Sequence, residues 1–168
     1  MAYCHWKYCP ECGAETTRRH DGEHTRPYCP ACGRFYYDNP PPVVAALALD
    51  PSGRILAVKR AVEPAAGEWC LVCGFMEILE TPEEAVLREL REEAGVNGAV
   101  KRLIAALYEP SPAYGSVIVL GYEISVEGEP KAGTDALEAR FFTPHELPRL
   151  AFSSHRRMVG ERVHPGPN

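Results

Sequence analysis

The stretch from Gly74 to Val96 constrains the fold more than any other part of this 168-residue chain. Thr81 is a favourable N-cap, a proline follows it, and Glu84 completes a T-x-x-E capping box. Gly95 can take the left-handed conformation that ends a helix. This pattern predicts a helix over residues 82–94. The apolar positions at helical spacing, which form the expected buried stripe, are Val86, Leu87, Leu90 and Ala94.

Three carboxylates fall close together on this expected helix. Glu92 and Glu93 follow Glu89 by three and four residues, so the three side chains reach a common side. Like charges at this spacing repel, and Arg88, four residues before Glu92, can offset part of the repulsion. A hard cation such as Mg²⁺ or Mn²⁺ would offset more, because it takes carboxylate oxygens as ligands. Clustered glutamates alone would favour a solvated acidic face instead.

Further fixed positions reverse that interpretation. The run follows the pattern G-x5-E-x7-R-E-U-x-E-E-x-G-U, where U is aliphatic, and it resembles the Nudix box at every fixed position. Those positions are filled by Gly74, Glu80, Arg88, Glu89, Leu90, Glu92, Glu93, Gly95 and Val96. The resemblance implies an α/β/α sandwich with a mixed sheet. It also implies a loop–helix–loop that binds Mg²⁺ or Mn²⁺ and hydrolyses a nucleoside diphosphate linked to another moiety.

The resemblance also assigns roles by position. Glu89, Glu92 and Glu93 become the metal-binding carboxylates, with Glu92 and Glu93 in the catalytic group. Arg88 becomes the residue that orients them by ion pairing, and Glu80 becomes an outer, supporting carboxylate of the metal site.

Two positions outside the helix complete the expected site. The backbone at Gly74 approaches the metal in such enzymes, which suits a residue without a side chain. A base or further metal ligand often follows the box in a later loop. Glu138, in an acidic stretch, is our candidate, although a surface glutamate explains it equally well.

A second pattern occupies the first part of the chain. Two C-P-x-C-G motifs, separated by a short segment, fit a tetrahedral four-cysteine zinc site. Such a closed site predicts a structural rather than a catalytic ion. Disulfides are the rival interpretation, disfavoured because we see no secretory signal. The expected Zn²⁺ ligands are Cys9, Cys12, Cys29 and Cys32.

The charge of this zinc-ribbon segment argues against nucleic acid as a partner. Positive and negative side chains balance within residues 1–38, and the whole chain has a net charge of −5. A protein that binds the phosphate backbone normally carries a basic patch. The ribbon could instead serve dimer contacts or cover a substrate pocket.

The order of motifs predicts three segments. Residues 1–38 form the zinc ribbon, 39–42 a stiff proline-rich connector, and 43–168 the Nudix hydrolase domain. Beyond the box, we expect a second helix over residues 153–162. The expected strands cover residues 43–50, 54–60, 69–73, 100–108, 115–126 and 139–142. Strands around one long helix, with another helix at the end, predict a mixed sheet between helices.

Composition places the chain among soluble globular proteins, with 45% hydrophobic and 24% charged residues. Its longest purely apolar run, Val43 to Leu49, is too short to span a bilayer, so no membrane partner is expected. Seven cysteines without an export signal predict a reducing compartment, the cytoplasm. The family resemblance makes a homodimer a possible assembly.

The substrate follows from weaker signals. Arg60 could meet a phosphate and Tyr114 could stack on a base, although an ion pair and a core aromatic are the ordinary alternatives. The loop over residues 108–116 lacks the tryptophan that NADH pyrophosphatases carry there, and Pro112 stands where ADP-ribose pyrophosphatases tend to have a proline. We therefore expect ADP-ribose or FAD ahead of NADH. A nucleotide-sensing module without activity is the alternative.

Two features are left without a function. Cys70 and Cys73 form a third C-x-x-C, which could be redox-active, but we interpret both as structural cysteines. His155 has no metal partner visible in the sequence and is assigned no role.

Overall fold

The proline run separates two units. A computed structural model of the chain describes residues 6–133 and 135–163, without the side chains of 161–163. Its contacts divide the chain into Met1–Pro40 and Pro41–Asn168. Within the described residues, neither helix has the length and apolar character needed to cross a membrane.

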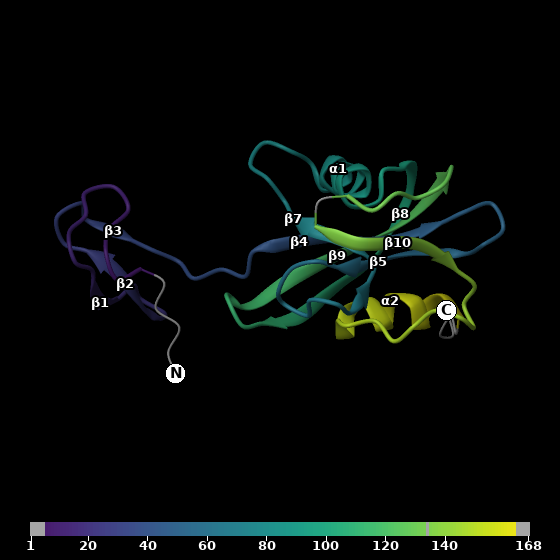
Figure 1. Cartoon of the computed structure of the whole chain (residues 1–168). Coiled ribbons are helices and arrows are strands. Elements are labelled where there is room, and N and C mark those ends of the chain that lie inside the picture. Colours follow the sequence, from purple (N-terminus) through teal and green to yellow (C-terminus); the bar gives the residue numbers. More distant parts are fainter. Residues whose placement is uncertain (1–5, 134, 164–168) are drawn as a thin grey trace. The chain divides into compact units, whose positions relative to one another are not determined.

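The first unit is a small antiparallel sheet in the order β1-β2-β3 (Figure 1). Its strands are β1 (Thr17–His20), β2 (Thr25–Cys29) and β3 (Arg34–Phe35). Cys9 and Cys29 are buried, and the rings of Trp6 and Tyr36 stack with their centroids 5.1 Å apart. This unit buries few large apolar side chains, so a metal would be a natural source of its stability.

The second unit is built on a seven-stranded mixed sheet in the order β10-β5-β4-β9-β8. β4 pairs with β9 in parallel and the other pairs are antiparallel; β6 pairs with β5, and β7 with β4. The strands are β4 (Pro42–Leu49), β5 (Ile55–Arg60), β6 (Trp69–Cys70), β7 (Val72–Phe75), β8 (Asn97–Ser111), β9 (Gly115–Glu127) and β10 (Ala136–Phe142).

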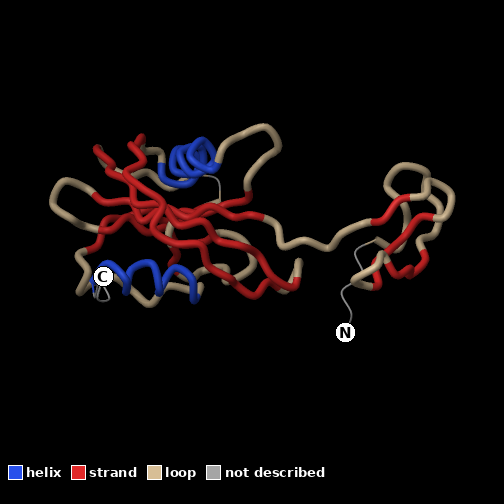
Figure 2. The backbone as a smooth tube through the Cα atoms, turned by 180° about the vertical axis from the view of Figure 1, so that it is seen from behind, coloured by secondary structure: helices blue, strands red, loops and turns tan. Residues whose placement is uncertain are grey.

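Helices cover both faces of this sheet, α1 (Pro82–Ala94) on one and α2 (Ser153–Val163) on the other (Figures 1 and 2). The central strand β4 shows why. Its side chains alternate, with Val44 and Ala46 in the core under α1 and Ala45 and Leu47 in the core under α2. A strand that is buried on both faces has a continuous run of apolar residues in its sequence. The predicted α/β/α sandwich with a mixed sheet is confirmed.

The local signals placed α1 correctly. Thr81 accepts a hydrogen bond from the Glu84 N–H, and the Glu84 carboxylate accepts one from the Thr81 N–H. Gly95, with φ of 65°, ends the helix. The buried stripe contains Ala85 and Glu93 in addition to the expected residues, whereas Leu87 is only partly buried.

Three strand predictions needed correction. The strand expected over residues 139–142 begins at Ala136, because Ala136 already pairs with Arg60 of β5. The strand expected over residues 69–73 breaks at Leu71, because the chain stops pairing with β5 and starts pairing with β4. β8 continues to Ser111 rather than ending at Tyr108, because it keeps pairing with β9 as far as Gly115. The proline in this extension is tolerated because β8 is an edge strand.

Candidate active site

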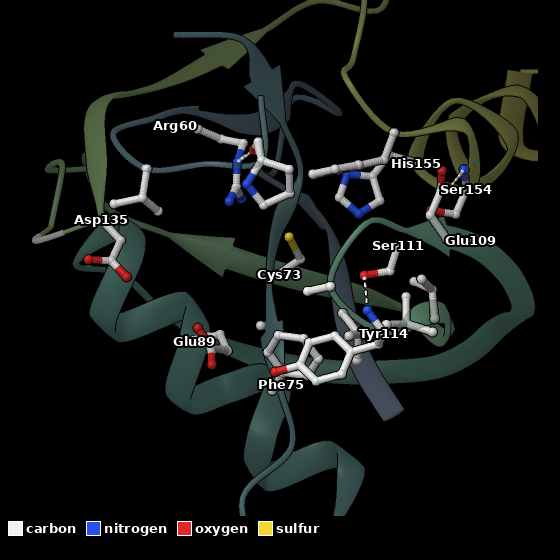
Figure 3. Close-up of a pocket in the computed structure, with 18 of the residues that line it drawn as sticks. Arg60, Cys73, Phe75, Glu89, Glu109, Ser111, Tyr114, Asp135, Ser154 and His155 are labelled. Atoms are coloured by element: carbon white, nitrogen blue, oxygen red, sulfur yellow. Dashed lines mark hydrogen bonds between the residues drawn. The ribbon is translucent and has the colours of Figure 1, made fainter. Parts of the chain in front are cut away.

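A cavity of about 930 Å³ opens between α1, β7, the β8–β9 hairpin and the start of α2 (Figure 3). Carboxylates from α1, from β8 and from nearby loops line it, together with two arginines. Its charged lining residues are Arg60, Glu63, Glu77, Arg88, Glu89, Glu92, Glu93, Glu109 and Asp135.

Glu93 is the buried acid of this cavity, with 9% of its surface exposed. It shares the apolar stripe of α1, three residues after Leu90, so helix packing carries it inward. The Cys73 N–H donates to its Oε2 at 3.1 Å. Burial is the main cause that raises the Glu93 pKa, to about 8, and the hydrogen bond from Cys73 opposes it. A bound cation would stabilise the negative charge of this buried carboxylate more than that of an exposed one.

Gly74 lets β7 come against Glu89. A Cβ at position 74 would lie 2.1 Å from the Glu89 carboxyl carbon, which no real contact allows. Glycine is therefore required at this point for the carboxylate to lie on the strand backbone. Burial raises the pKa of Glu89, and its ion pair with Arg88 opposes that effect.

Arg88 connects the other acids. Its guanidinium holds Glu80 through two hydrogen bonds of 2.8 and 3.1 Å, and it also donates to Glu89 at 2.7 Å and to Glu92 at 3.2 Å. A further bond reaches the Phe75 carbonyl oxygen at 3.0 Å. The hydrogen bonds from Arg88 lower the pKa of Glu80 to about 2. Glu80 thus fixes the arginine, and the arginine spaces Glu89 from Glu92.

The three expected metal ligands differ in depth. The Glu92 side chain is 57% exposed, the Glu89 side chain 13%, and Glu93 turns toward the Cys73 amide. Among the described residues, they do not form a set of oxygens within 4.8 Å of one another. Their donor chemistry nevertheless fits Mg²⁺ or Mn²⁺, since all three are carboxylates and Gly74 provides the close backbone approach.

An acid missed in the sequence lines the cavity beside the end of α1. Gly133 donates to the Glu93 carbonyl oxygen at 3.0 Å, and a Cβ on Gly133 would lie 1.7 Å from the Glu92 carbonyl oxygen. This close approach delivers Asp135 to the cavity lining, on the same side as Glu89 in Figure 3. The acidic stretch that suggested Glu138 contains Asp135 too.

Glu138 itself lies elsewhere. Its carboxylate accepts from the Lys59 ammonium at 3.1 Å and lies 3.9 Å from the Arg140 guanidinium. It does not appear among the described residues that line the cavity. The register of β10 against β5 shifts between Ala136 and Glu138, and sequence spacing cannot show such a shift.

The opposite side of the cavity is aromatic. Tyr114 and Phe75 meet edge to face with ring centroids 5.2 Å apart, and both rings are partly exposed. Figure 3 shows the two rings next to each other, away from Asp135. Arg60 also lines the cavity, where its Nε donates to the Pro64 carbonyl oxygen at 2.6 Å. Both predicted substrate contacts therefore reach this cavity.

Glu109 positions the start of α2. Its carboxylate accepts from the Ser153 N–H at 3.3 Å and the Ser154 N–H at 2.6 Å, which satisfies free amides of the first turn. Burial disfavours its charge, but these hydrogen bonds outweigh that effect and lower its pKa. His155 follows in the same turn. It is buried, and burial lowers its pKa to about 3, so the ring is neutral.

The four cysteines of the first unit converge. Their sulfurs all lie within 4.8 Å, with Cys9 and Cys32 at 3.8 Å and Cys12 and Cys29 at 3.6 Å. Four sulfurs around a zinc ion would be separated by about 3.8 Å, whereas a disulfide needs about 2 Å. The six cysteines within the described residues are free thiols. The ligand set and its spacing fit zinc.

Comparisons with known proteins agree with this geometry. A family model described as NUDIX domain matches residues 39–161. A crystal structure of a NUDIX hydrolase from Nitrosomonas europaea covers 96% of this chain, and this chain covers 94% of it, with 30% identity and a TM-score of 0.81.

Two kinds of curated relative match the sequence. An ADP-ribose pyrophosphatase from Methanocaldococcus jannaschii is 40% identical over 121 residues, which is 71% of each chain. The NAD-capped RNA hydrolase NudC of Pseudomonas aeruginosa is 32% identical over 149 residues, 87% of this chain. The chain spans about half, 51%, of NudC.

Proposed function

Because this chain belongs to the Nudix pyrophosphohydrolases, we propose that it hydrolyses the diphosphate of ADP-ribose, with Mg²⁺ or Mn²⁺ as its cofactor. The products would be AMP and ribose 5-phosphate. FAD, which also contains an ADP group, is the next candidate.

The charge of the cavity is the observation that carries this proposal. Seven carboxylates and two arginines line the cavity, so a dianionic diphosphate would meet net repulsion there. Divalent cations remove that repulsion, because each one can bind protein carboxylates and phosphate oxygens together. An acidic cavity of this size suits a nucleotide only as a metal complex.

The residues of α1 and β7 have separate proposed roles in this reaction. Glu89, Glu92 and Glu93 would hold the metal, and the backbone at Gly74 leaves room for Glu89. Bound Mg²⁺ or Mn²⁺ supplies charge neutralisation at the phosphates and activation of a water. Arg88 keeps Glu89 and Glu92 apart and anchored, and it is itself fixed by Glu80.

A carboxylate must also accept the proton of the attacking water. We propose Asp135 for this step in place of Glu138, because Asp135 lines the cavity while Glu138 pairs with Lys59. Asp135→Asn and Glu138→Gln form a matched pair of charge-removing variants. Asp135→Asn should lower kcat by about 10²-fold or more, whereas Glu138→Gln should retain most of it. The reverse ranking would restore Glu138 as the base.

The substrate proposal is supported by the archaeal relative, whose printed name is ADP-ribose pyrophosphatase. The Phe75–Tyr114 pair offers a ring surface for adenine, and Arg60 offers a cation for a phosphate. NADH and NAD-capped RNA rank after FAD, and NAD-capped RNA is included because the match to NudC, which is named for that substrate, extends over 87% of this chain.

A panel of ADP-ribose, FAD, NADH and NAD-capped RNA tests the choice. With saturating Mg²⁺ or Mn²⁺, the highest kcat/KM should belong to ADP-ribose, with AMP released. Glu93→Gln should remove turnover while a thermal melt shows a folded protein. If the panel yields no turnover, the proposed activity fails, and binding without turnover would indicate a nucleotide sensor.

For the first unit we propose one structural Zn²⁺ held by Cys9, Cys12, Cys29 and Cys32. A closed four-thiolate site leaves no position for substrate, so this ion would stabilise the unit rather than take part in hydrolysis. Elemental analysis of Cys12→Ser should show about one zinc ion fewer per chain than the parent protein. An unchanged zinc content would contradict the assignment.

A further inference from the structure

A second group of soft ligands lies beside the cavity. The sulfurs of Cys70 and Cys73 and a ring nitrogen of His155 all lie within 4.8 Å of one another. Of the described residues, only this group and the four ribbon cysteines bring three or more such donors so close. Cys70 and His155 are fully buried, while Cys73 and His155 also line the cavity.

The break in the strand creates this arrangement. In an unbroken strand, residues three apart point to opposite faces. Here the chain leaves β5 after Cys70 and joins β4 at Val72, so Cys70 and Cys73 come together across Leu71. C-x-x-C is the spacing with which two cysteines chelate one metal ion.

His155 comes from a distant part of the chain, and the lone pair of its Nδ1 points toward the backbone N–H of Leu71. Its Nδ1 accepts a hydrogen bond from the Leu71 N–H at 3.2 Å. Since the buried ring is neutral, the proton sits on Nε2, and the Nδ1 lone pair faces the segment between the two thiols. An ion bound at Nδ1 would replace this one hydrogen bond and would require no change of tautomer.

Glu109 helps to fix the position from which His155 reaches the two cysteines. It holds the amides of Ser153 and Ser154 immediately before His155. Figure 3 shows the Cys73 sulfur between the side chains of Arg60 and His155. Metal-binding histidines commonly depend on such outer contacts for their orientation.

We propose that Cys70, Cys73 and the Nδ1 of His155 bind a second zinc ion, separate from the ribbon ion and from the carboxylate site. Two thiolates and an imidazole are ligands that Zn²⁺ prefers over Mg²⁺ or Mn²⁺. Three protein ligands leave the fourth position of a tetrahedral ion vacant. That position would face the cavity, since Cys73 and His155 line it.

The ion would act on the strand that supports Glu93. The Cys73 N–H donates to Glu93 Oε2, so an ion that holds the Cys73 sulfur also holds this amide in place. Zinc binding here does not depend on the hydrolytic activity, and its test is a measurement of bound metal.

The experiment uses the full chain, kept reduced, with zinc measured by elemental analysis and ¹¹³Cd NMR recorded after exchange of zinc for cadmium. The proposal predicts one more zinc ion per chain in the parent protein than in Cys73→Ser. It also predicts a cadmium resonance from a two-sulfur, one-nitrogen site, beside the resonance of the four-sulfur ribbon.

Cys12→Ser is the matched control, because it removes a ribbon ligand and should leave the second resonance unchanged. Equal zinc content in the parent protein and Cys73→Ser would overturn the proposal. If Cys73→Ser does not fold, the parent spectrum decides. A mixed sulfur–nitrogen resonance supports the site, and a four-sulfur resonance alone rejects it.

Discussion

Glu93 is buried because of where it stands on its helix. It lies three residues after Leu90 and seven after Val86, so it belongs to the stripe that α1 packs against the sheet. The sequence predicted this stripe from its apolar members and predicted Glu93 as a ligand. The two patterns together imply a ligand carboxylate inside the core. The Cys73 amide offsets part of the cost of burying it.

A pH dependence of metal binding follows from that burial. A ligand carboxylate must lose its proton to bind a cation, and burial raises the Glu93 pKa to about 8. Below that pH, we expect the apparent Mn²⁺ affinity to rise about tenfold per pH unit, and above it to level off. Isothermal titration between about pH 6 and pH 9 measures this. Glu93→Gln should remove the pH dependence, and a flat profile in the parent protein would contradict the prediction.

The same shift has a consequence for the metal-free fold. Between the ordinary value of 4.5 and about 8, the unfolded chain loses the Glu93 proton while the folded chain keeps it. The unfolded state therefore binds fewer protons, and the contribution of Glu93 to stability falls as the pH rises through this window.

Gly74→Ala tests the contact between β7 and Glu89. The added Cβ would lie 2.1 Å from the Glu89 carboxyl group, which can swing away because it ends a flexible side chain. We expect kcat/KM for ADP-ribose to fall by about 10²-fold while the melting temperature changes little. Gly160→Ala, where nothing lies within 4 Å, is the control and should keep its activity. Full activity in Gly74→Ala would show that Glu89 needs no such contact.

Leu79 is strained in the loop that precedes α1. It has a φ of 70° and is 98% exposed, so its side chain gains no packing in return. Asn tolerates this conformation better, and Leu79→Asn should raise the free energy of unfolding by about 1 kcal/mol. Urea unfolding measures it, with Ile78→Asn as the control: Ile78 is 87% exposed and its φ is negative. Equal stabilisation by both variants would point to lost surface hydrophobicity instead.

At the scale of helices and strands, the sequence predicted those bounds that depend on residues close by in the chain. The bounds of α1 follow from Thr81, Glu84 and Gly95, each within a few residues of the helix end that it determines. The break at Leu71 depends on two partner strands, and the placement of Asp135 depends on how residues 131–133 pack on α1. Neither is visible in sequence spacing. The sequence therefore pointed to the acidic stretch and predicted Glu138 within it, whereas the cavity lining favours Asp135 as our proposal.

Gly133→Ala tests the packing of that segment. Its Cβ would lie 1.7 Å from the Glu92 carbonyl oxygen, and backbone cannot move aside as a side chain does. We expect a loss of about 2 kcal/mol or more in stability, together with a loss of AMP release, because Asp135 follows the displaced segment. Chemical unfolding and the ADP-ribose assay measure the two effects. Normal values for both would mean that the segment packs differently.

In the whole molecule, the site combines parts that lie far apart in sequence. α1 contributes the box carboxylates, β7 the backbone at Gly74, the β8–β9 hairpin Tyr114, and α2 His155. The box identified the family. Together with the C-P-x-C-G motifs it also predicted two metal sites, because each motif carries its expected ligands at short spacing. His155 hydrogen-bonds to a residue 84 positions away, so its link to Cys70 and Cys73 appears only in the folded chain.

The hydrolytic role of the carboxylates is tested by a crystal structure with Mn²⁺ and an ADP-ribose analogue whose bridging oxygen is replaced by a methylene group. We expect anomalous scattering from manganese bound to oxygens of Glu89, Glu92 and Glu93, with the same ions contacting the diphosphate. A diphosphate bound in the cavity with these three side chains apart and free of metal would contradict the proposed function.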